Sequence, residues 1–305
     1  MMVVSVRSSR NYEDILRSAT LEEVVSGDFD GLVASNSESR YAGIEPGRGY
    51  PFISEGSIVE PFMETRFHLA AGNALLNEKM DIQWTIERKL EDATMILEET
   101  TTNDPFLDVT IDFVGDIKVT AKAGDVKVQR SFLSRYVRRN IRGLSEEARN
   151  SYFDANKIVA VTSGPDGKRE YGDDFEPLTY FVKIHLNAAG GRKTDKFHDG
   201  LGFVTQHCAL TDAFETSLRA IDPKLSVPYW SYTEDSAHMK DKFDGDPAAL
   251  WTFDVWQDDW FGNASGSRFH TVEQGRFAYM RVEIDFSNDI HNPYGFLRSP
   301  WNMNN

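Results

Sequence analysis

The sequence predicts an α+β protein of more than one domain, in which an antiparallel, sandwich-like β module precedes a mainly helical domain. Three observations predict this class. A chain of 305 residues is long enough for two domains. Between about residues 59 and 128 apolar and polar residues alternate, which is the period of a β-strand. Between residues 203 and 218 apolar residues recur at three- and four-residue steps, which is the period of a helix, and residues 178–186 form an earlier apolar run.

The N-terminal part, residues 1–58, predicts one helix and a linker. Residues 11–26 carry apolar residues on one side, with Asn11 as a cap and Gly27 as an end. Residues 27–58 are rich in Gly, Ser and acidic residues and contain Pro46 and Pro51, which predicts a loop.

Residues 59–130 predict the β-rich module. Turn signals at residues 114–116 and 123–125 separate its strands. The alternating apolar positions are Ile82, Trp84, Ile86, Val109, Ile111, Phe113, Ile117, Val119, Ala121, Val126 and Val128. His68 lies in the first candidate strand, and we interpret it as a half-buried strand residue rather than a metal ligand. No chemistry is visible in this module.

Residues 131–305 predict the helical domain. Its first segment is rich in arginine, which we interpret as a helix that pairs with the protein's own carboxylates; the arginines are Arg135, Arg138, Arg139 and Arg142. Residues 163–168 predict a turn. After Trp230 the helical signals fade. The aromatic run at residues 251–261 has two interpretations, the wall of a substrate cavity or packing onto the helices, and we favour packing.

Three of the seven histidines lie in one stretch, at His185, His198 and His207. Imidazole is a ligand suited to copper, zinc, iron and nickel. One regular helix cannot bring His198 and His207 to the same metal, because nine steps place them on opposite sides and about 13 Å apart. We therefore expect His198 in a loop that ends near residues 200–202, between a helix that carries His185 and a helix that carries His207. On spacing alone, a metal site and a core histidine with two surface histidines both stay open.

The residues around these histidines resemble the first copper-binding half of the tyrosinase family, the type 3 copper proteins that include tyrosinases, catechol oxidases and haemocyanins. The family pattern is a histidine, a variable gap, a second histidine, eight residues and a third histidine. The matching segments are residues 198–203, 206–207, 214–215, 221–223 and 228–230, and the resemblance extends over about residues 130–305.

The resemblance implies a helical-bundle copper domain with His185, His198 and His207 as the ligands of one copper. It implies oxidation of phenols and o-diphenols to o-quinones with dioxygen, and so dioxygen and phenolic small molecules as partners. Glu215, which follows His207 by eight residues, is expected to form an ion pair in the bundle or to support a ligand, and not to act as a catalytic base.

Two departures from the family pattern stand out. The aspartate that commonly follows Pro-Tyr-Trp is Ser231 here. The family's second copper is held by an H-x-x-x-H pair and a later histidine, yet no two of this chain's histidines are four residues apart. The copper domain is therefore expected to be incomplete, and we favour a fragment over a protein reduced to one site. Whether the chain by itself is an enzyme stays open.

Charge and hydropathy exclude several classes. A net charge of −15 argues against nucleic-acid binding, which calls for a basic patch. No run of 18 apolar residues and no convincing signal peptide is found, so we expect no membrane span and assign no compartment. Two alternatives to an oxidoreductase stay open: a non-catalytic single-copper or haemocyanin-like protein, and an acidic, metal-free interaction module.

Overall fold

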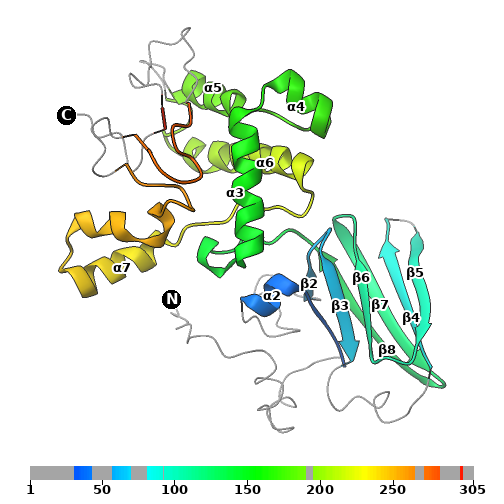
Figure 1. Ribbon diagram of the computed structural model, residues 1–305. Coiled ribbons are helices and arrows are strands. Elements are labelled where there is room, and N and C mark those ends of the chain that lie inside the picture. Colours follow the sequence, from blue (N-terminus) through cyan, green and yellow to red (C-terminus); the bar gives the residue numbers. More distant parts are fainter. Residues whose placement is uncertain are drawn as a thin grey trace. The chain divides into compact units, whose positions relative to one another are not determined.

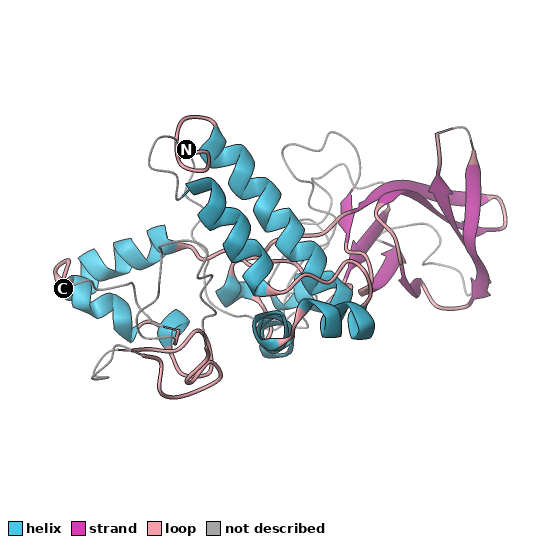
Figure 2. Ribbon diagram, turned by 90° about the horizontal axis from the view of Figure 1, so that it is seen from above, coloured by secondary structure: helices cyan, strands magenta, loops and turns pink. Residues whose placement is uncertain are grey.

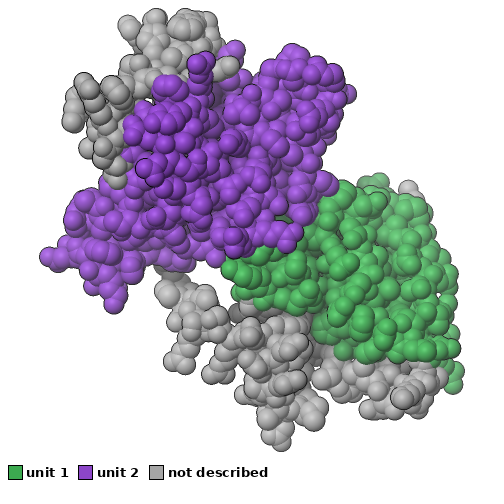
Figure 3. Space-filling model, viewed as in Figure 1, with its two compact units in different colours: residues 1–137, 143–145 green, residues 138–142, 146–305 purple. Residues whose placement is uncertain are grey.

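The computed structural model describes residues 31–42, 57–69, 81–91, 93–189, 195–264, 271–281 and 296–297. It contains both sheets and helices, which confirms the mixed α+β class (Figure 1, Figure 2). The chain forms two compact units, coloured separately in Figure 3: residues 1–137 with 143–145, and residues 138–142 with 146–305. The division at residues 58 and 130 stays a prediction. None of the described helices is long and apolar enough to cross a membrane.

The first unit holds two sheets that share one core. The smaller sheet has the order β1-β3-β6, formed by Leu32–Ser35, Glu64–Leu69 and Phe106–Thr110. The larger has the order β2-β8-β7-β4-β5, formed by Ser57–Val59, Val126–Ser134, Gly115–Ala123, Ile82–Lys89 and Thr94–Thr102. Phe67 of β3 and Phe132 of β8 meet edge to face at 5.1 Å between ring centroids. Apolar residues from both sheets are therefore buried together, as in a sandwich.

The alternating pattern correctly predicts the inward face of the central strands. The fully or almost fully buried positions are Ile82, Trp84 and Ile86 in β4 and Ile117, Val119 and Ala121 in β7. The turn at residues 123–125 is also confirmed, because β7 and β8 pair antiparallel up to Ala123 and Val126. Gly124 in this turn has a φ of 56°, a value that favours glycine.

Three expectations for the first unit are wrong in part. The predicted loop at residues 27–58 contains β1, the short helix α2 (Ser37–Tyr41) and the start of β2, because pairing with β3 and β8 supplies hydrogen bonds that local composition does not reveal. The β2–β8 pair is parallel, so the sandwich is not purely antiparallel. Two of the three residues of the predicted turn at 114–116 belong to β7, and the bend before them links β6 and β7, which lie in different sheets. The predicted helix at residues 11–26 lies outside the described residues.

The second unit is helical. Its elements are α3 (Glu146–Val161), α4 (Gly164–Tyr171), α5 (Leu178–Ala189), α6 (Gly202–Ile221), α7 (Tyr232–Phe243), and the 3₁₀ helices η3 (Pro247–Thr252) and η4 (Asp254–Trp256). Helix α3 packs against both α5 and α6. Phe153 of α3 is fully buried, and the rings of Trp260, Phe261 and Phe277 surround it at 5.0–6.2 Å. These aromatic side chains therefore pack onto the bundle.

Two segments of this unit are more helical than expected. The predicted turn at residues 163–168 is the start of α4, where the Ser163 hydroxyl accepts a hydrogen bond from the Asp166 N–H and so caps the helix. Helical structure also continues after Trp230, in α7. Helix α7 lacks a strong apolar stripe, but acids in its first turn and lysines in its last turn suit the helix dipole.

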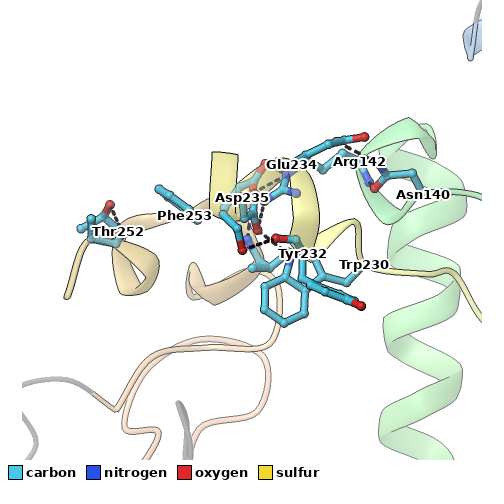
Figure 4. Close-up of polar contacts among 12 residues, drawn as sticks. Asn140, Arg142, Trp230, Tyr232, Glu234, Asp235, Thr252 and Phe253 are labelled. Atoms are coloured by element: carbon cyan, nitrogen blue, oxygen red, sulfur yellow. Dashed lines mark hydrogen bonds and ion pairs between the residues drawn. The ribbon is translucent and has the colours of Figure 1, made fainter. Parts of the chain in front are cut away.

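The arginine-rich segment is extended and not helical, apart from the 3₁₀ helix η2 (Ile141–Gly143). Its interpretation as a partner of internal carboxylates holds. Arg142 donates to Asp235 of α7 and to Asp254 of η4, and the Trp230 indole N–H donates to Asp235 at 2.6 Å (Figure 4). Asp235 is 6 % exposed. These hydrogen bonds and ion pairs connect α7 and η4 to the arginine segment. The acceptor for the Trp230 indole is Asp235, which lies four residues after Ser231.

Candidate metal centre

The structure brings the three predicted histidines together from three backbone contexts. His185 lies on α5, His198 in the turn at residues 195–200, and His207 on α6. One potential ligand atom from each ring lies within 4.8 Å of those of the other two. The ring centroids are 5.2–5.6 Å apart. Within the part of the chain that the structure describes, this is the one such group of three or more metal-ligating side chains.

Packing between α5 and α6 points two of the rings toward each other. Phe181 of α5 and Phe214 of α6 meet edge to face at 5.4 Å. His185 follows Phe181 by four residues and His207 precedes Phe214 by seven, so each histidine shares a helix face with a residue of this contact. The apolar pattern that pairs the helices therefore also places the two imidazoles.

The turn that carries His198 is held at several points. The Lys196 N–H donates to the carbonyl oxygen of Ala188 at the end of α5, at 3.0 Å. Phe197 is 4 % exposed, and its ring contacts His185 and His207 at 5.1 and 5.3 Å. At Gly202, where α6 begins, a Cβ atom would lie 2.8 Å from the Lys196 carbonyl oxygen. The predicted loop and its glycines are thus present, and Gly202 allows the close approach.

Hydrogen bonds at Nδ1 orient two of the rings. His207 Nδ1 lies 2.7 Å from the carbonyl oxygen of Phe203, one helical turn earlier. A carbonyl oxygen carries no proton, so Nδ1 of His207 must be the donor, and the neutral ring keeps its lone pair on Nε2. His198 Nδ1 lies 2.6 Å from Asp195 Oδ2, an acceptor that leaves Nε2 of His198 free in the same way. Both rings are thus prepared to bind a metal through Nε2.

The third ring is kept neutral by its surroundings. Partial burial lowers the pKa of His185, the neighbouring imidazoles lower it further, and the Asp195 carboxylate opposes them. A neutral imidazole is the form that binds a metal. Three neutral imidazoles suit copper, zinc, iron or nickel. If the three imidazole nitrogens bound one metal at about 2.0 Å, they would lie about 3.3–3.5 Å from one another. The side chains would have to shift by about 1 Å to reach that spacing. The donor set therefore fits a metal ion.

The side of the triad formed by the first turn of α6 is open. Leu201, Phe203 and Val204 are 86 %, 53 % and 58 % exposed, whereas Leu218 near the other end of the helix is fully buried. The N-terminal end of α6 is therefore exposed, whereas the part near its C-terminal end is buried. His207 is only half-buried there, and the Phe203 ring lies 4.9 Å from it.

Glu215 is an ion-pair residue of the bundle, in agreement with the sequence interpretation. It is 2 % exposed and accepts two hydrogen bonds from Arg138, one from Arg219 and one from the Val227 N–H, each at 2.8 Å. Burial raises the pKa of Glu215, but these donors outweigh it and hold that pKa below its usual range. A carboxylate with four donors is not available as a base.

The remaining histidines stand apart from the triad or lie outside the described residues. The His238 ring on α7 contacts Phe243 and Phe253. His68 is a half-buried residue of β3 in the first unit, as expected, and burial lowers its pKa. His270 and His291 lie outside the described residues. Sequence reasoning missed Asp195, although its position three residues before His198 was a usable signal.

Comparison with known proteins identifies one family. Residues 176–304 match the family model described as the common central domain of tyrosinase. The matched range contains the three histidines and Glu215 together with helices α5, α6 and α7. No curated protein and no solved structure matches this chain.

Proposed function

This chain belongs to the tyrosinase family, and we propose from that premise that His185, His198 and His207 hold one copper ion through their Nε2 atoms. The match of residues 176–304 to the central domain of tyrosinase supports a copper oxidoreductase function at the level of the family. The observation that supports this ligand set is the convergence of three imidazoles, two of which keep Nε2 free through a bond at Nδ1.

The protein's own groups would prepare the site for phenolic substrates and dioxygen. Copper, when bound, supplies the redox centre for that chemistry. Helices α5 and α6 hold two ligands at a fixed distance, and the buried Phe197 ring braces both. The exposed Phe203 ring, which lies 4.9 Å from the His207 ring, places an apolar surface beside the triad that suits an aromatic substrate.

Electron counting limits what one such site can do. A diphenol loses two electrons and two protons when it becomes an o-quinone, whereas one copper ion that cycles between its +2 and +1 states accepts one electron. The sequence contains no H-x-x-x-H pair for a second copper. We therefore expect the chain as given to bind copper without turning over catechol, and a second copper site to be needed for the full reaction.

The test is metal analysis of the purified, copper-loaded chain beside two variants. We expect one copper per chain, loss of that copper in His207→Ala, and its retention in His238→Ala, where the histidine is outside the triad. Nitrogen hyperfine splitting in the electron paramagnetic resonance (EPR) spectrum should show imidazole ligands in the wild type and in His238→Ala, and the copper signal should be lost in His207→Ala. Equal copper content in the wild type and His207→Ala would refute the ligand assignment.

A non-catalytic copper-binding function is the second candidate, because the described residues hold one three-histidine group rather than two. Oxygen uptake with catechol tests whether the chain by itself forms an oxidase centre. Sustained uptake by the copper-loaded chain would exclude the non-catalytic function, whereas absence of uptake with bound copper agrees with both candidates. The metal-free interaction module predicts unchanged metal content and melting temperature after alanine substitution of His185 and His207.

A further inference from the structure

Asp195 makes three hydrogen bonds in the turn that carries His198. Its Oδ1 accepts from the backbone N–H groups of Phe197 and His198, both at 2.9 Å. Its Oδ2 lies 2.6 Å from Nδ1 of the His198 ring. Oδ1 thus stabilises the backbone of the turn, whereas Oδ2 contacts the imidazole.

We propose that Asp195 is a positioning residue of the metal centre, which holds the His198 ring in the tautomer with a free Nε2 and aims that atom at His185 and His207. This inference rests on the proposed copper site. A carboxylate at the second nitrogen of a metal-binding imidazole fixes the tautomer and ring orientation and makes the ring a stronger donor. Asp195 touches neither the metal position nor a substrate and acts through His198 alone.

His198 needs such a partner more than the other two ligands do. His185 and His207 stand on helices, and the bond of His207 at Nδ1 goes to a carbonyl oxygen of its own helix. His198 stands on a turn, and its side chain is 43 % exposed. An exposed side chain outside a helix has more rotamers to lose when it binds a metal. The bond to Asp195 removes much of that freedom before the metal arrives.

The partners of Asp195 in this turn are all donors. Its two oxygens face the N–H groups of Phe197 and His198 and the Nδ1 atom of the His198 ring, so a carboxylate, which only accepts hydrogen bonds, suits every one of these contacts. An acceptor at this position permits a proton on Nδ1 and excludes one on Nε2 for the neutral ring.

Asp195→Asn tests the proposal with little change in shape. The amide oxygen can keep the backbone bonds of the turn, but the amide nitrogen then faces Nδ1 and is a donor, which favours the tautomer that blocks Nε2. We expect copper affinity, measured by competition with a chelator, to fall 10- to 100-fold. The urea midpoint of the metal-free chain should stay unchanged. Asp199→Asn removes the same charge one residue beyond His198 and should keep wild-type affinity.

A second arm shows whether Asp195 acts through His198. In the His198→Ala background, Asp195→Asn should cause no further loss of affinity, and an equal loss in both backgrounds would overturn the proposal. Affinity of Asp195→Asn within twofold of wild type would overturn it as well. Histidine side-chain ¹⁵N NMR of the metal-free chain should show the Nδ1–H tautomer for His198 in the wild type but not in Asp195→Asn. Because that readout needs no metal, it separates failure of this inference from failure of the copper site.

Discussion

Substitution of Glu215 by Gln should destabilise the helical unit more than the loss of any exposed ion pair does. Glu215 accepts four hydrogen bonds, from Arg138, Arg219 and the Val227 N–H, and only 2 % of its surface is exposed. Gln has nearly the same shape and can still accept from the Val227 N–H. Its amide nitrogen, however, must face an arginine donor, and the negative charge is gone.

The size of this destabilisation depends on how well each arginine that loses the carboxylate can be hydrated. Removal of one partner from a buried ion pair costs about 3–5 kcal/mol. The Arg138 side chain is 45 % exposed and can be rehydrated, so its share is discounted, whereas the Arg219 side chain is 19 % exposed. We expect Glu215→Gln to lower the free energy of unfolding of this unit by about 2–3 kcal/mol at pH 7. Arg169→Ala, which removes a solvent-exposed pair with Asp166, should change the free energy of unfolding far less.

The measurement is urea unfolding of the metal-free chain, followed by tryptophan fluorescence, to which Trp230, Trp251, Trp256 and Trp260 of the helical unit contribute together with Trp84 of the first unit. The pH dependence adds a second check. The pKa of Glu215 is lowered in the folded chain, so its contribution is complete above the ordinary glutamate value of about 4.3 and is lost as pH falls through the lower folded value. The difference between wild type and Glu215→Gln should therefore shrink in acid.

Two results would refute this reasoning. One is a destabilisation by Glu215→Gln no larger than that of Arg169→Ala, which would show that the buried contacts contribute little. The other is a difference between wild type and variant that stays constant from pH 7 down to about pH 2, which would show that charge is not the cause.

Three further outcomes are expected. Gly167→Ala should cost about 2–3 kcal/mol in urea unfolding, because its Cβ would lie 2.0 Å from the fully buried Phe175 ring, whereas Gly143→Ala meets nothing within 4 Å and should be nearly neutral. Gly202→Ala should lower copper affinity at least about tenfold in chelator competition, since the new Cβ would push the Lys196 carbonyl and the turn of His198; unchanged affinity would contradict this. Copper affinity should be constant above pH of about 6.5 and fall below it, because protons compete with the metal for the imidazoles. His185, whose pKa is lowered, should keep its lone pair to lower pH than an exposed histidine does. A pH-independent affinity between pH of about 7 and 5 would argue against histidine ligands.

The sequence by itself determined those features that depend on neighbours along the chain. Alternation at residues 82–86 and 117–121 predicts the buried faces of β4 and β7, because strand side chains alternate between two faces. The step of nine residues between His198 and His207 excludes a shared helix and predicts a turn before α6. The histidine spacing and the segments around it were also sufficient to indicate the family.

Only the tertiary structure decided features that depend on distant partners. Strand β1 lies in a segment whose composition indicates a loop, and it exists because β3 pairs with it. The arginine segment is not the predicted helix, and its guanidinium groups bind carboxylates far along the chain, such as Glu215. The bond between Asp195 and His198 spans three residues, yet its meaning appears only when α5 and α6 bring His185 and His207 beside it. Periodicity records which face of a segment is buried, whereas a partner from another segment is specified by the packing of the whole chain.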